Sequence, residues 1–208
     1  MVASWVRRNF DGVGVTQYKP GRHLEAVQDH YCGKALLCID VSYSMEGAPL
    51  RAAVDGGLDF LSEARTAYYK CGLVLWAGRV VTHLRTNTDH EKVRGRLRSA
   101  RPGYGTALAP TLRAAIKELG PMSGDRVVCV FSDGIIPDAT EAAPLAKRAR
   151  ALGIRFVVRG LGDEAGRSLG RILRPDQEDA AETIRNVGDL RRGIASMAVS
   201  LRAGRKRS

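Results

Sequence analysis

Apolar residues are gathered into short continuous runs along the chain. Each run is bounded by glycine or charged residues, which is typical of β-strands buried on both faces. Four such runs are clear: Ala35–Val41, Cys71–Ala77, Val127–Phe131 and Ile154–Leu161. Two weaker patterns predict further strands, an antiparallel edge strand at Val80–Leu84 and a last strand at Glu182–Val187.

Between and after these runs, apolar residues recur at helical spacing. A proline near the start of a pattern and a glycine at its end favour a helix. The patterns predict four helices, around Leu50–Leu61 after Pro49, Leu108–Leu119 before Gly120, Ala139–Leu152 before Gly153, and Asp189–Leu201. This alternation predicts an α/β fold with a doubly wound, mostly parallel central sheet and helices on both sides.

The length of 208 residues suits one α/β domain rather than two. Residues 1–33 do not follow the alternation, so we expect an N-terminal arm there, with a short helix near Gly21–Tyr31. The domain itself is expected to span residues 34–202, and residues 203–208 to form a basic C-terminal tail.

The composition is that of a soluble protein, with 44% hydrophobic and 26% charged residues. No apolar run approaches the roughly 18–20 residues of a membrane span, and the first residues lack the apolar core of a signal peptide. None of the four cysteines lies in a CxxC or CxxH pattern, so we expect reduced thiols. Together these features predict a cytoplasmic protein without a membrane partner.

The chain is strongly basic, with 33 Lys and Arg against 22 Asp and Glu, a net charge of +11. Such an excess favours acidic partners, whether protein or polyanion, through long-range attraction. A solvated basic surface without a dedicated ligand is the equally weighted alternative.

Polar residues with metal-binding chemistry follow the first strand, in the stretch LLCIDVSYSM. Asp40, Ser42 and Ser44 occupy alternate positions, and alternate residues of an extended segment point the same way. One carboxylate and two hydroxyls suit a hard divalent cation such as Mg2+. The sequence therefore predicts a metal site at the carboxyl end of this strand, where ligands of such sheets bind.

Two other segments supply oxygen ligands at the same edge of the sheet. The strand VVCVFSDG leads directly into Asp133, and the glycine-rich loop GYGTALAP places Thr106 immediately before a helix. The candidate metal ligands are therefore Asp40, Ser42, Ser44, Thr106 and Asp133.

The segments DVSYS, GYGT and FSDG, in this order, resemble the metal-ion-dependent adhesion site of von Willebrand factor A-type domains. The likeness extends over roughly residues 35 to 202. It implies a Rossmann-like fold that binds Mg2+, or Mn2+ or Ca2+, directly through the two serines and Thr106 and largely through water at the two aspartates. It also implies that an Asp or Glu carboxylate of a protein partner completes the metal's coordination shell.

Three residues are candidate contacts with that partner. Tyr43 stands where the family commonly has glycine, Tyr104 lies in the GYGT segment, and Arg159 interrupts the strand IRFVVRGLG. Tyr is enriched at protein interfaces. The alternatives are a tolerated exposed ring at Tyr43 and a locally satisfied strand-end arginine at Arg159.

The leading function is a non-enzymatic, metal-dependent interaction module, an adaptor or scaffold. The sequence shows no nucleophile paired with a base, no GxxxxGK[ST] phosphate loop and no GxGxxG after a strand. Resemblance to small stand-alone bacterial proteins of this family implies work beside an AAA+ ATPase, in a stress-response or defence system.

Two alternatives stay open. The cluster KVRGRLRSAR, the tail RKRS and the net charge would suit a nucleic-acid-binding protein. A metal-dependent phosphohydrolase would use Asp40 as nucleophile, but Ser42 stands where such enzymes place a second aspartate for proton transfer.

Overall fold

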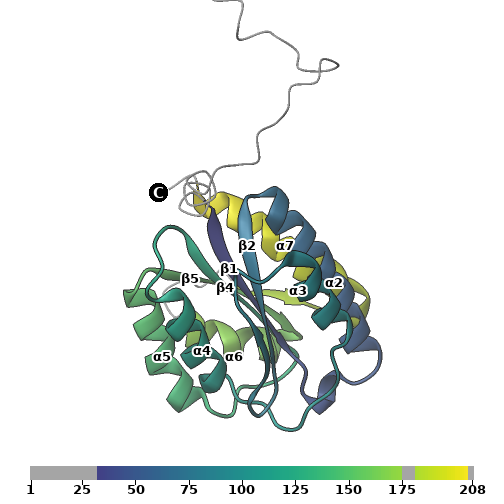
Figure 1. Ribbon diagram of the computed structural model, residues 1–208. Coiled ribbons are helices and arrows are strands. Elements are labelled where there is room, and N and C mark those ends of the chain that lie inside the picture. Colours follow the sequence, from purple (N-terminus) through teal and green to yellow (C-terminus); the bar gives the residue numbers. More distant parts are fainter. Residues whose placement is uncertain (1–31, 175–180, 206–208) are drawn as a thin grey trace, which may run out of the picture. The chain divides into compact units, whose positions relative to one another are not determined.

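A computed structural model describes residues 32–174 and 181–205 of the chain (Figure 1). The described residues belong to one compact unit. The predictions for the N-terminal arm up to residue 31, including its short helix, and for residues 206–208 of the tail lie outside the described residues.

The strands form where the apolar runs predicted them. All four main runs are strands, and Val80–Leu84 is the expected edge strand. Their bounds are β1 (Gly33–Asp40), β2 (Tyr69–Trp76), β3 (Val80–Leu84), β4 (Arg126–Ser132), β5 (Ile154–Leu161) and β6 (Ala181–Ile184).

The helices lie between and after these strands, and the four predicted ones are all present. Their bounds are α2 (Ala48–Thr66), α3 (His90–Arg98), α4 (Ala109–Leu119), α5 (Ala139–Ala151), α6 (Asp163–Leu173) and α7 (Val187–Arg205). A single turn of 3-10 helix, η2, spans Tyr43–Met45.

The six strands form one sheet in the order β3-β2-β1-β4-β5-β6. All neighbours are parallel except β2 and β3, which are antiparallel. The central pair is in register, with Ile39 of β1 opposite Phe131 of β4. The strand order changes direction at β1 and β4, so the loops that follow these two strands lie at the point where such sheets bind ligands.

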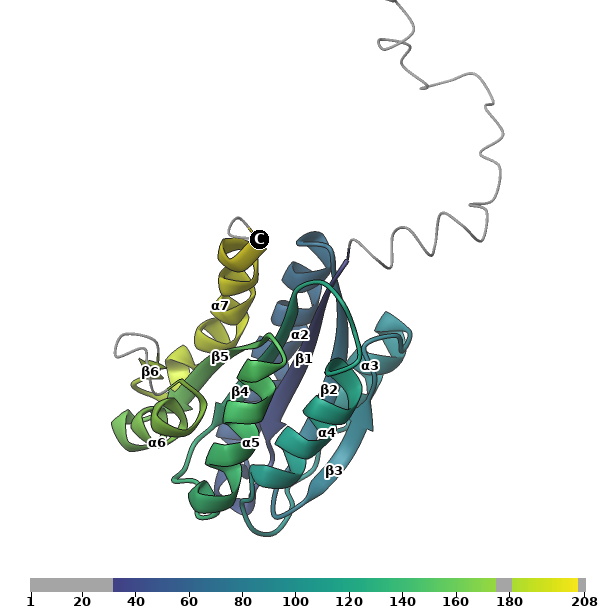
Figure 2. The same cartoon turned by 90° about the vertical axis from the view of Figure 1, so that its left-hand side faces the viewer.

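Two apolar layers hold helices against the sheet. Side chains of α2, α3 and α7 pack on one face and those of α4, α5 and α6 on the other. The ribbons in Figures 1 and 2 show these helices on the two sides of the sheet. Leu37 and Phe131 belong to the first layer, while Leu36 and Val130 belong to the second. This alternation within one strand explains why the strands are continuous apolar runs.

Some bounds differ from the predictions. The sequence patterns did not predict α3 or α6 as helices. The last strand ends at Ile184 rather than Val187, because its pairing with β5 ends there and α7 begins at Val187. Since α7 extends to Arg205, residues 203–205 of the predicted tail are helical.

The four cysteines are free, as expected, and three of them are buried. Among the described residues, no helix is long and apolar enough to cross a membrane.

Candidate metal centre

The loop after β1 turns Asp40 and two serines toward one another. Asp40, the last residue of β1, is fully buried, and its Oδ1 accepts a hydrogen bond of 2.7 Å from the Ser42 backbone N–H. The η2 turn follows, with Met45 buried beneath it. This turn brings the Ser44 hydroxyl to 3.0 Å from the Ser42 hydroxyl.

The end of β4 completes the cluster from a distant part of the sequence. The Ser132 hydroxyl donates to Asp40 Oδ2 at 2.6 Å. The next residue, Asp133, accepts a 3.0 Å hydrogen bond from the Ser44 hydroxyl at Oδ1. Asp40, Ser42, Ser44 and Asp133, four of the five predicted metal ligands, thus lie in one hydrogen-bonded network.

Thr106 lies on a loop fastened to the same edge of the sheet. The Gly103 N–H donates to the Val41 carbonyl at 2.6 Å, and the Ala107 N–H donates to the Ala77 carbonyl at 2.8 Å. These bonds hold the loop beside the ends of β1 and β2. Thr106 is half-buried, and its side chain has no hydrogen bond to the other four predicted ligands within residues 32–174.

Both carboxyl groups of the cluster resist ionisation in the metal-free protein. Burial raises the pKa of Asp40 to about 6, despite opposing hydrogen bonds from Ser132 and Ser42, and the nearby Asp133 adds to the increase. Burial also raises the pKa of Asp133, against the hydrogen bond from Ser44. A divalent cation would stabilise the ionised form of both groups.

The donor set fits a hard cation rather than a soft one. In the described part of the chain, no group of three or more His, Cys, Asp and Glu residues is placed to hold a metal. The cluster instead offers two carboxylates and two hydroxyls, all oxygen donors of the kind that Mg2+ takes together with water. Ser44 is exposed and Asp133 half-exposed, so the cluster opens to solvent on one side.

Two residues at this edge have supporting roles that the sequence analysis missed. Ser132 fixes Asp40, and only its place beside Asp133 in FSDG could have indicated this. Asp138, the residue before the first turn of α5, accepts hydrogen bonds from the Leu108 and Ala109 backbone N–H groups at 3.0 and 2.7 Å. It therefore caps α4, next to the loop that carries Thr106.

The candidate partner contacts fall into two classes. The rings of Tyr43 and Tyr104 stack in parallel, with centroids 6.1 Å apart, and both are exposed, at 60% and 88%. Arg159 is buried; its guanidinium donates to the Val158 carbonyl at 2.8 Å and to the Ser196 hydroxyl of α7 at 3.4 Å. That placement fits the alternative of a strand-end arginine satisfied within the domain.

One family model matches this region of the chain. Residues 35–135 match the model of the von Willebrand factor type A domain. The matched segment runs from β1 to the loop after β4 and contains all five residues that the sequence predicts as metal ligands. No curated protein is significantly similar to the chain.

Solved structures of von Willebrand factor A-type domains share the fold. A von Willebrand factor type A protein from Catenulispora acidiphila has 16% identity and a TM-score of 0.69, covering 83% of this chain and 43% of that one. The vWF domain of the type V pili tip protein Mfa5 from Porphyromonas gingivalis has 14% identity and a TM-score of 0.70, covering 84% and 96%.

A third structure of this fold is a pilus adhesin, SpaC from Lactobacillus rhamnosus GG, with 14% identity and a TM-score of 0.70. The alignment covers 84% of this chain and 31% of SpaC, so the present chain spans less than half the length of SpaC and of the Catenulispora protein. These likenesses confirm the predicted Rossmann-like α/β fold. Domains of this type commonly serve in adhesion and protein interaction.

Proposed function

We propose that this domain is a non-enzymatic, divalent-metal-dependent module that binds a protein partner. Asp40, Ser42, Ser44, Thr106 and Asp133 would hold Mg2+, or Mn2+ or Ca2+, and an Asp or Glu side chain of the partner would complete the coordination shell. The observation that carries this proposal is the position of Ser44. Its hydroxyl lies 3.0 Å from the Ser42 hydroxyl and 3.0 Å from Asp133 Oδ1. It joins the ends of β1 and β4 at the switch point of the sheet.

The chemistry of the donors supports capture of a carboxylate. Hydroxyl ligands carry no charge, so a cation held mainly by them keeps a strong attraction for an incoming anion. The open side of the cluster, at Ser44 and Asp133, gives such an anion access. The net charge of +11 attracts an acidic partner over longer distances.

The surroundings of Asp40 favour binding over catalysis. Its two carboxylate oxygens accept hydrogen bonds from the Ser42 N–H and the Ser132 hydroxyl, and its side chain is fully buried. A nucleophile of a phosphohydrolase would need one of these oxygens directed at substrate, with an acid or base nearby to move a proton. Ser42 occupies the position of that second group.

The cellular setting is a further part of the proposal. We place the module in the bacterial cytoplasm, as an adaptor beside an AAA+ ATPase in a stress-response or defence system. Its support is the resemblance of the DVSYS, GYGT and FSDG segments to small stand-alone bacterial proteins of this family, together with four free thiols. The partner named by this proposal is a protein with an accessible acidic residue.

Affinity capture tests the proposal. The immobilised protein is exposed to an extract of its native cells in Mg2+ and in EDTA, beside Asp40→Ala and the matched control Asp59→Ala. Asp59 is partly exposed on α2 and pairs with Arg191. We expect a partner retained only in Mg2+, by the wild type and Asp59→Ala but not by Asp40→Ala.

Capture that is indifferent to EDTA and to Asp40→Ala contradicts the proposal. If such capture is lost at high salt and nuclease treatment releases the bound material, the function lies in the basic surface and a nucleic acid is the ligand, because phosphate contacts weaken steeply with salt.

A further inference from the structure

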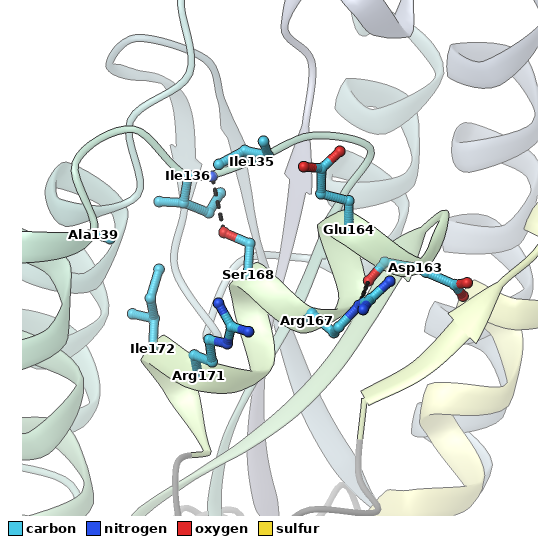
Figure 3. A pocket seen from close by; sticks show the side chains of 9 residues that line it. All are labelled: Ile135, Ile136, Ala139, Asp163, Glu164, Arg167, Ser168, Arg171 and Ile172. Carbon is cyan, nitrogen blue, oxygen red and sulfur yellow. Dashed lines mark hydrogen bonds between the residues drawn. The ribbon is translucent and has the colours of Figure 1, made fainter.

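A groove opens beside the candidate metal centre, between α6 and the loop that joins β4 to α5 (Figure 3). Its volume is about 710 Å3. The residues that line it are Ile135, Ile136, Ala139, Asp163, Glu164, Arg167, Ser168, Arg171 and Ile172. The Ile136 backbone N–H donates to the Ser168 hydroxyl at 3.1 Å, which fastens the loop to α6.

The groove is continuous with the metal centre through the chain itself. Ile135 lies two residues after Asp133, so their Cα atoms are at most about 7 Å apart. A segment that brings a carboxylate to a metal at Asp133 therefore has Ile135 within reach of its neighbouring residues. A residue about two to four positions away from that carboxylate would lie above the groove.

One part of the groove is apolar. Ile135 is 55% exposed, although it is a large aliphatic side chain, while Ile136 and Ile172 are buried below it. Figure 3 shows these three isoleucines on the two sides of the space between the loop and α6. An apolar side chain placed here would remove the exposed part of Ile135 from water.

The two ends of the groove carry opposite charges. Glu164 lies near Ile135, and Arg171 follows two turns later along α6, about 10 Å away along the helix axis (Figure 3). Within the described residues Arg171 has no ion pair, and Arg167 donates from Nε to the backbone carbonyl of Asp163. The far end is thus ready to bind an anion, whereas Asp163 and Glu164 would repel a polyanion such as a nucleic acid.

We propose that this groove binds an apolar side chain of the same partner segment whose carboxylate reaches the metal, and that a second acidic residue of that segment pairs with Arg171. The order along the segment is acid, then an aliphatic or aromatic residue, then acid. This proposal rests on the metal-dependent binding proposed above, and it adds the sequence pattern that distinguishes the partner from other acidic proteins.

Selection from a displayed library of random peptides tests it. The library is bound to the immobilised protein in Mg2+ and eluted with EDTA. The wild type should enrich peptides with an acidic residue, an apolar residue about two to four positions away and a further acid beyond it. A synthetic peptide of the enriched sequence then serves as the probe for affinity measurements.

Two variants with matched controls assign the contacts. Ile135→Ser should weaken binding of the enriched peptide about fivefold to tenfold, and Val199→Ser, which removes another exposed aliphatic side chain on α7, should not. Arg171→Glu should shift the selection away from the second acid, whereas Arg148→Glu, an exposed arginine on α5, should not. All four positions are at the surface, so folding should be preserved.

The outcomes separate this inference from the proposed function. One contrary result is a set of EDTA-eluted peptides that share an acidic residue but no apolar position, and another is an affinity for these peptides that Ile135→Ser leaves unchanged. Either result overturns the proposed binding in the groove, while the metal-dependent function stands. No EDTA-eluted enrichment at all overturns both. Mg2+-dependent self-association that Ile135→Ser abolishes assigns the groove to a second copy of this chain and overturns the proposed pattern.

Discussion

Asp40→Asn is expected to stabilise the metal-free protein at pH 8 while it abolishes the stabilisation that Mg2+ gives the wild type. The pKa of Asp40 is raised from 3.8 to about 6 by burial, so ionising this group in the folded state is unfavourable. An amide avoids that cost, and its oxygen can still accept the hydrogen bond from Ser42. It supplies no negative charge to a cation.

The direction of the pH dependence follows from the same shift. A carboxyl group whose folded pKa exceeds its unfolded value stabilises the fold when protonated, and this contribution is lost as pH rises from about 4 through about 6. A shift of about two pK units corresponds to about 3 kcal/mol. Since the amide leaves the Ser132 hydroxyl without its acceptor, at a cost of about 1 kcal/mol, the net gain at pH 8 should be about 2 kcal/mol.

Urea unfolding measures both effects. Unfolding curves in EDTA at pH 4 and pH 8 should show a higher free energy of unfolding for Asp40→Asn than for the wild type only at pH 8. Added Mg2+ should raise the urea midpoint of the wild type alone. Asp59→Asn is the control, because its exposed ion pair with Arg191 contributes little. An Asp40→Asn protein that is less stable than the wild type at pH 8, or still stabilised by Mg2+, contradicts this description of the site.

Gly160→Ala is expected to destabilise the domain by about 3 kcal/mol or more. A Cβ atom at position 160 of β5 would lie 2.2 Å from the backbone nitrogen of Gly166 and 2.5 Å from its Cα. Both are backbone atoms of α6, so no side-chain rotation relieves the overlap and the helix must move away from the sheet. The groove beside Ile135 would change shape as a result.

Thermal unfolding of Gly160→Ala can be compared with Gly95→Ala. Gly95 lies inside α3, is exposed, and has no atom within 4 Å of the position of an added Cβ. Alanine should stabilise that helix by about 0.5–1 kcal/mol. The two substitutions should therefore shift the melting temperature in opposite directions, and equal shifts would show that α6 is not packed against β5 through this glycine pair.

The same glycine pair explains why the sequence did not reveal α6. Gly166 and Gly170 lower the helix propensity of this stretch, so its sequence does not stand out as a helix. Gly166 allows α6 to pack closely against Gly160 of β5, and this is a tertiary contact. Propensity along the sequence carries no information about such a contact.

Helix α3 was missed for a different reason. Of its nine residues only Val93 and Leu97 are buried, and the rest are mostly charged. Its sequence was interpreted as a basic cluster with possible nucleic-acid contacts. A helix with so narrow an apolar stripe is held by the β2 and α2 surfaces that it covers, which the local pattern does not show.

The part of the candidate metal centre that lies at the ends of the strands could be predicted from the sequence. Parallel strands buried on both faces were clear, and their carboxyl ends meet at one edge, so Asp40 and Asp133 had to be neighbours. The role of Ser132, the capping of α4 by Asp138 and the burial of Arg159 depend on side-chain directions. Those are set by the packing of α4, α5 and α7.

Direct titration with Mn2+, followed by its electron paramagnetic resonance signal, tests the central claim of a divalent-metal site. The sharpest variant is Thr106→Val, because Thr106 is assigned to the site by its loop and by the family pattern, and valine keeps the shape of the side chain. Thr88→Val is the control, a half-buried threonine of the loop before α3. We expect one Mn2+ bound by the wild type and by Thr88→Val, displaced by Mg2+, and at least about tenfold weaker binding by Thr106→Val. No saturable Mn2+ binding by the wild type, or equal binding by Thr106→Val, would contradict the five-residue metal site.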